Sequence, residues 1–185
     1  MDQIKFAILT TLKLTVICLA VTILYLAIGI FLGENYSYYF AINPFTSGLI
    51  HSGFSHLEWN IFGIFISLNM ACNRHYTTEK IFWITSLIAI IYLPLIIIDS
   101  EFASVGISGT CYFLLIRGLG SQSRKSIKIF CYFLLSNIII KEALEIGNTD
   151  KIAHSVHFIG SILGLISLYP YRLKFLHDKI YEIIS

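Results

Sequence analysis

Long stretches without charged residues limit how this chain can fold more than any other feature. Residues 81–98 and 152–171 contain no Lys, Arg, Asp or Glu. Of all 185 residues, 56% are hydrophobic and 13% are charged, and the mean hydropathy is +0.77. That is too little polar surface to coat a water-soluble domain of this size. We therefore expect an integral membrane protein.

The apolar stretches predict transmembrane helices rather than strands. The bilayer core holds no water for an open strand edge, whereas a helix satisfies its own backbone N–H and C=O groups. Six helices are expected, at about residues 6–32, 56–72, 81–98, 102–117, 126–144 and 152–171. No internal repeat, linker or low-complexity tract divides the chain. The predicted fold is therefore all-α and polytopic, with one domain over residues 1–185.

Lysine and arginine predict the orientation of these helices. With a cytoplasmic N-terminus, eleven of the thirteen basic residues lie on the inner side, and only Lys141 and Lys151 lie outside. Such a bias follows the positive-inside rule and places both termini in the cytoplasm. The first apolar stretch is too long for a cleaved signal peptide, so we expect it to remain as an anchor. Topology also accounts for the net charge of +2, and a nucleic-acid partner is not expected.

The cysteines predict neither a disulfide framework nor a metal site. Each lies within or at the end of an apolar stretch, with no close pairing: Cys18, Cys72, Cys111 and Cys131. Buried free thiols are the usual form of such residues. We expect no metal ion and no other cofactor.

Polar residues from three expected helices converge at a similar depth on the external side. His51 and His56 lie at the entry to the second helix, and Asn60 follows four residues deeper. Ser108 lies in the outer half of the fourth helix and His157 in that of the sixth. An imidazole can take the proton of a serine hydroxyl, and polar donors can stabilise the oxyanion of an acyl transfer. This set of residues is typical of a serine hydrolase.

Glycines near these residues predict close helix packing. Gly160 and Gly164 follow His157 by three and seven residues, which places all three on one helical face. Small residues on such a face let a neighbouring helix approach closely. Gly106 and Gly109 lie on either side of the candidate serine, where they should likewise allow close packing.

Taken in order, the motifs resemble the signature of the rhomboid family of intramembrane serine proteases. The segment 51–60 reads HSGFSHLEWN, with the spacing His, four residues, His, three residues, Asn. Gly-x-Ser-Gly follows as GISG, and His-x-x-Gly-x-x-x-Gly as HFIGSILG. The resemblance covers about residues 44–168 and suggests a minimal, bacterial-type six-helix core. It implies a serine endopeptidase in the inner (cell) membrane, with an active site open to the external side.

The resemblance also implies roles for individual residues. Ser108 would be the nucleophile and His157 the general base of a dyad without a third acid. His51 would order the first external loop, and Tyr112, one turn after the serine, would support the histidine ring. The oxyanion would be stabilised by four residues: His56, Asn60, Ser108 and Gly109. The partner would be a single-span membrane protein with small or helix-breaking residues near the cut.

The same residues allow other interpretations. A proteolytically inactive relative could bind transmembrane segments without cutting them. His154 could be the base in place of His157, although it lacks the two glycines at the same spacing. Ser108 and Asn60 could be ordinary packing and helix-linking residues. A metal site could use the four histidines His51, His56, His154 and His157, because imidazole suits zinc.

The basic-residue asymmetry makes a testable prediction about topology. A reporter that is active only outside the cytoplasm should be silent when it is fused after Ser185, because the positive-inside rule holds that end in the cytoplasm. Reporter activity in whole cells measures this, with a fusion in the connection around Glu145 as the external control. An active reporter after Ser185 would mean an odd number of spans.

Overall fold

The computed structural model describes residues 2–33, 39, 43–51, 54–70, 75–98, 107–121, 133, 136, 140 and 151–169. Its elements are α1 (Gln3–Leu32), η1 (Ser47–Leu49), α3 (Phe54–Leu68), α4 (Thr78–Ile98), α5 (Ser108–Gly120) and α7 (Lys151–Ile166). Within these ranges there is no strand, which confirms the all-helical prediction for the described part of the chain. The expected helix at 126–144 lies outside it, apart from three single residues.

One helix in the described part, α1, is long and apolar enough to cross a membrane by length and composition. Its buried residues form one narrow stripe: Ala7, Thr10, Thr11, Leu14 and Cys18. Much of its remaining surface is exposed and apolar, as at Ile23 and Phe31. A helix that faces water usually presents polar residues on its outer side. The surface of α1 is therefore compatible with membrane association.

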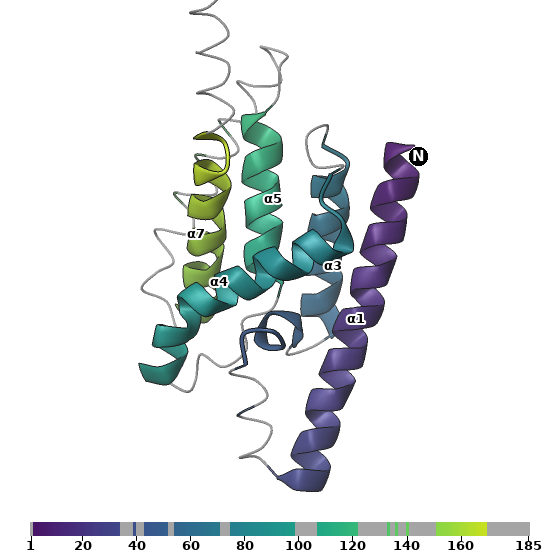
Figure 1. The fold of residues 1–185 in the computed structure, drawn as a ribbon, viewed down its shortest axis with the longest axis vertical. Helices are drawn as coiled ribbons and strands as arrows, with labels where there is room; N and C mark the ends of the chain where they lie inside the picture. The colour runs from purple at the N-terminus through teal and green to yellow at the C-terminus, as the bar shows by residue number, and fades with distance from the viewer. Residues whose placement is uncertain are drawn as a thin grey trace, which may run out of the picture.

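The described helices form a row that one helix crosses. Figure 1 shows α7, α5, α3 and α1 running roughly along the long axis of the molecule, side by side in that order. The helix α4 runs obliquely across this row and contacts α1, η1, α5 and α7. Among the described helices, the most extensive contact is that between α5 and α7. The helix that begins with the candidate serine, α5, thus lies between α7 and α3 and also contacts α4.

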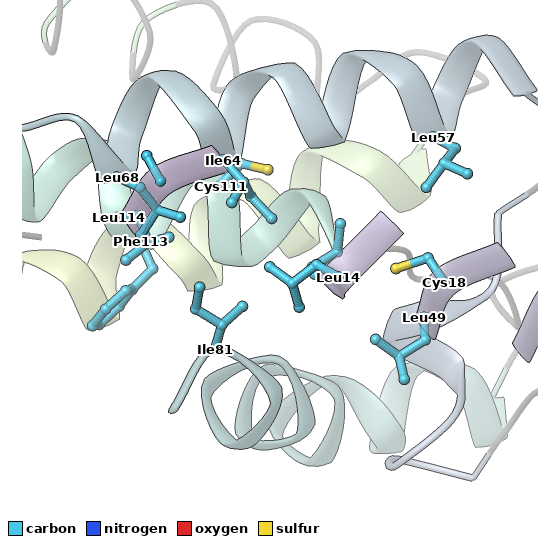
Figure 2. Close-up of a cluster of buried hydrophobic side chains, with 12 residues drawn as sticks. Leu14, Cys18, Leu49, Leu57, Ile64, Leu68, Ile81, Cys111, Phe113 and Leu114 are labelled. Carbon is cyan, nitrogen blue, oxygen red and sulfur yellow. The ribbon is translucent and has the colours of Figure 1, made fainter. Parts of the chain in front are cut away.

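A hydrophobic core lies where α1, α3, α4 and α5 meet. Figure 2 shows apolar side chains from these helices and from η1 pointing toward one another. Members include Leu14 of α1, Leu57 and Ile64 of α3, Ile81 of α4 and Leu114 of α5. A second, smaller cluster joins α4 to α7 through Ile88, Tyr92 and Val156. The crossing helix therefore packs against both ends of the row.

The boundary of α5 differs most from expectation. We predicted a helix from about residue 102, but α5 begins at Ser108, and Ile107 is its N-cap residue. The apolar stretch shows which residues avoid water and does not show where helical hydrogen bonding begins. The rest of the predicted start, residues 102–106, lies outside the described residues. Ser108 consequently lies in the first turn of the helix instead of one or two turns inside it.

Glycines bring the backbones of α5 and α7 into contact, as their spacing predicted. A Cβ atom on Gly160 would lie 2.0 Å from the carbonyl oxygen of Gly109, and one on Gly109 would lie 2.7 Å from Cγ1 of Val156. Gly164 lies one turn further along, where a Cβ would come within 2.9 Å of the Phe113 carbonyl oxygen. No side chain fits at the first of these positions without separating the two helices.

Replacing Gly160 by alanine should therefore destabilise the fold. The added methyl group would overlap backbone, which cannot move aside as a flexible side chain can, and overpacking of this kind typically costs about 1–3 kcal/mol. Thermal unfolding in detergent measures the change. Gly63→Ala is the matched control, because its Cβ would meet Cys111 Sγ at an ordinary 3.6 Å. Equal melting temperatures for the two variants would contradict the close α5–α7 contact.

Candidate active site

Ser108 is buried at the start of α5. Its side chain is only 4% exposed, and its Oγ atom has no hydrogen-bond partner among the described residues. The first N–H groups of a helix have no partner within it and carry a partial positive charge. Ser108 and Gly109 contribute the first two such groups of α5. A hydroxyl group and backbone donors therefore lie together at this helix end.

His157 is held by an aromatic ring from the neighbouring helix. Its ring stacks on that of Tyr112, with centroids 4.1 Å apart and planes only 12° from parallel. Tyr112 lies four residues after Ser108, and hence on the same face of α5. The close approach at Gly160, three residues after His157, brings this part of α7 against that face. The stack fixes the plane of the imidazole ring.

One cavity brings the predicted polar residues together. It has a volume of about 530 Å³ and lies between α3, α5 and α7. Five residues predicted for the site line it: His56, Asn60, Ser108, Tyr112 and His157. Most of the remaining wall is apolar and includes Phe62, Ile66 and Leu115. The expected meeting of the three motifs is therefore seen in the described structure.

Asn60 adds a second polar group without a partner. The residue is 7% exposed, and its Nδ2 atom has no hydrogen-bond partner among the described residues. Leaving such a group unpaired away from water typically costs about 1–3 kcal/mol. Asn60 and Ser108 both line the cavity. The amide can donate to an oxygen atom, as the predicted oxyanion role requires.

Cys111 is a cavity residue that sequence reasoning missed. We expected only a buried free thiol there, and it is one. It also lines the cavity, and its Sγ donates to the backbone oxygen of Asn60 at 3.2 Å. Its position three residues after Ser108 is the signal that could have identified it, because such residues share a helical face. Cys18 is likewise a buried free thiol, and Cys72 and Cys131 lie outside the described residues.

His51 lies behind the cavity instead of lining it. Its ring meets that of His56 edge-on, with centroids 5.3 Å apart, and its Nδ1 lies 3.0 Å from the carbonyl oxygen of Leu49. A carbonyl only accepts hydrogen bonds, so Nδ1 carries the proton in this contact. The backbone N–H of His51 also donates to Thr22 Oγ1 of α1 at 3.3 Å. These contacts join the segment before α3 to η1 and α1.

Some predicted residues remain untested. Gly106 lies outside the described residues, and so does the side chain of His154, although its backbone belongs to α7. Gly109 and Gly164 take part in the α5–α7 contact, as described above. The described side chains include no group of three or more His, Cys, Asp or Glu residues arranged to hold a metal ion.

Comparison of the chain with known protein families, with curated proteins and with solved structures finds no match. What is known of this protein therefore comes from its own structure. The described part of the chain is helical, and a serine, a histidine and an asparagine line one cavity.

Burial of His51 predicts a pH dependence of stability. Desolvation lowers the pKa of this histidine from 6.5 to about 4, although the hydrogen bond to Leu49 acts in the opposite direction. Between these values the unfolded chain binds a proton that the folded protein excludes, so acid favours unfolding. The melting temperature in detergent should be flat above about pH 6.5 and should fall as the pH drops toward 4.

The control for this prediction compares His51 with an exposed histidine. His51→Asn should make the melting temperature less steeply pH-dependent in this window, whereas the same substitution at the exposed His75 should leave the profile unchanged. Identical profiles for the wild type and His51→Asn would contradict the buried, neutral state of this ring.

Proposed function

We propose that this chain is an intramembrane serine endopeptidase of the rhomboid type, in which Ser108 and His157 form a catalytic dyad. One observation carries the proposal: buried Ser108, whose hydroxyl has no hydrogen-bond partner among the described residues, lines the same cavity as a histidine ring that Tyr112 holds in place. A packing serine inside a helix usually donates to a carbonyl in the preceding turn, as Ser161 does to His157. Ser108 is the first residue of α5, so no earlier turn of this helix offers its hydroxyl a carbonyl.

The proposed reaction needs only these neutral groups. Neutral His157 takes the proton of Ser108 as Oγ bonds to the scissile carbonyl carbon, whose oxygen becomes an oxyanion. Asn60, His56 and the helix-end N–H groups are the donors for that charge. Collapse of the intermediate breaks the C–N bond, and His157 passes its proton to the leaving amine. Water, deprotonated by the same histidine, then hydrolyses the acyl ester and restores the serine.

The nature of the cavity supports a substrate that comes from the membrane. Exposed apolar side chains on α3 border the site, including Trp59, Phe62 and Ile66. A transmembrane segment could reach the site along such a surface, but its helix must unwind before a serine can attack its backbone. The substrate would therefore be a single-span protein with small or helix-breaking residues near the cut. The proposal also includes the topology: the chain would cross the inner membrane six times, with both termini in the cytoplasm and the site open to the external side.

Labelling by a fluorophosphonate tests the dyad. The purified protein in detergent should react covalently at Ser108, and Ser108→Ala should abolish the reaction, because the probe needs an activated serine. His157→Ala should reduce labelling to background, whereas His154→Ala should retain most of it. Fluorescence in a denaturing gel measures the adduct, and mass spectrometry locates it.

The matched histidine pair makes the result specific. Both residues lie on α7, so a general loss of folding would affect both variants alike. Strong labelling of Ser108→Ala would contradict the nucleophile, and the reverse ranking of the histidines would move the base to His154. A wild-type protein that binds a transmembrane peptide but neither cuts it nor reacts would favour the inactive relative. Loss of cleavage on adding a chelator would favour a metal site.

A further inference from the structure

A buried hydrogen bond joins the crossing helix to the start of α5. Oγ1 of Thr85 on α4 lies 2.7 Å from Oγ1 of Thr110, two residues after Ser108. Both threonines are almost fully buried, at 4% and 1% exposure. The cavity itself is lined by residues of α3, α5 and α7, and by none of α4. This bond therefore connects the first turn of α5 to a helix that lies behind the site.

The direction of the bond follows from counting hydroxyl protons. Thr85 Oγ1 also lies 2.8 Å from the carbonyl oxygen of Ile81, which can only accept. The single proton of Thr85 is used there, so the hydroxyl of Thr110 must donate to Thr85. Each proton then has one acceptor, and the pair is satisfied away from water. A valine at position 110 would keep the shape but remove the donor.

The methyl group of Thr85 has a second close neighbour, in η1. A Cβ atom on Gly48 would lie 2.3 Å from Cγ2 of Thr85, so this position has no room for a side chain. Gly48 is buried, and the next residue, Leu49, supplies the carbonyl that accepts from His51. Thr85 thus contacts the segment that leads to His51 on one side and the helix that carries Ser108 on the other.

A further contact places α4 against the same turn of α5. The Cγ2 atom of Ile88, three residues after Thr85, would lie 3.1 Å from a Cβ added to Gly109. Residues three apart share a helical face, so one face of α4 holds both Thr85 and Ile88 against the first turn of α5. Apolar packing alone could slide along the helix, whereas a directional hydrogen bond fixes one register.

We infer that Thr85 and Thr110 are positioning residues, which set the register of Ser108 against the wall that carries His56 and Asn60. This inference rests on the proposed function and adds α4 and η1 to the parts of the fold on which the reaction depends. Neither threonine lines the cavity. They act through the position of the first turn of α5, so their loss should slow the chemical step more than it weakens substrate binding.

Substitutions at Thr110 test the inference. Thr110→Val should lower kcat roughly ten- to hundredfold with little change in KM, as a small misplacement of a nucleophile can do. The rate of fluorophosphonate labelling should fall in parallel, and Thr110→Ser, which keeps the donor, should restore both. Thr15→Val is the control: it removes a threonine hydroxyl whose hydrogen bond, to the carbonyl oxygen of Thr11, lies within α1 and away from the site.

Gly48 offers an independent second test through suppression. Gly48→Ala should slow labelling, because its methyl group displaces Thr85. Adding Thr85→Ser removes the Cγ2 atom from the clash and keeps the hydroxyl, and the next-nearest atoms lie at 3.6 Å. The double variant should therefore label faster than Gly48→Ala alone. A double variant no faster than Gly48→Ala would overturn the link between η1 and Thr85.

The outcomes distinguish this inference from the proposed function. A labelled wild type with an equally fast Thr110→Val variant would overturn the inference and leave the protease proposal standing. So would a Thr110→Val variant whose melting temperature falls but whose folded form reacts at the wild-type rate, because that result is a purely structural effect. A wild type that does not react at Ser108 would overturn both.

Discussion

At Gly160 the backbone of α7 lies so close to the carbonyl of Gly109 that no side chain fits between the two helices. The arrangement of the candidate site follows from this contact. It brings the α7 turn with His157 against the α5 face with Tyr112, and the two rings stack. Because Gly109 directly follows Ser108, the contact also holds the first turn of α5 against α7. Helices that lack glycine at such a contact stay further apart, because side chains separate them.

The interior of the protein tolerates polar groups that a purely structural core would avoid. Ser108 Oγ and Asn60 Nδ2 are both buried without a partner in the described structure, although each such group costs about 1–3 kcal/mol. Other buried polar atoms away from the cavity, such as Thr11 Oγ1 and Ser47 Oγ, also lack a hydrogen-bond partner among the described residues, whereas several polar groups between helices are paired. Thr85 and Thr110 bond to each other, and Arg117 donates to the Ser167 carbonyl at the end of α7. Ser108 and Asn60 differ from the other unpaired residues because both line the same cavity, and a cluster of such departures in an otherwise consistent fold is typical of functional sites.

The sequence was enough to predict the helical class and the meeting of three motifs, because both follow from spacing along the chain. Hydropathy identifies apolar helices, and the glycines after His157 mark a face for close packing. The sequence was not enough to predict that α4 crosses the row of helices. A helix that is apolar on all sides has no polar face to indicate how it is oriented against its neighbours. The start of α5 and the bond between Thr85 and Thr110 were also missed. They depend on local hydrogen bonds and on contacts between segments 25 residues apart.

The proposed dyad lacks a carboxylate, and the surroundings of the cavity give a physical reason. Among the described residues that line it there is no Asp or Glu, and most of the wall is apolar. A permanently charged group in such surroundings would pay a large desolvation cost. In the proposed reaction, opposite charges arise together on His157 and on the oxyanion, and they disappear together. Stacking on Tyr112 can orient the imidazole without charge, which is the task that a carboxylate performs in a serine protease triad. A neutral resting site is therefore consistent with both the cavity and the chemistry.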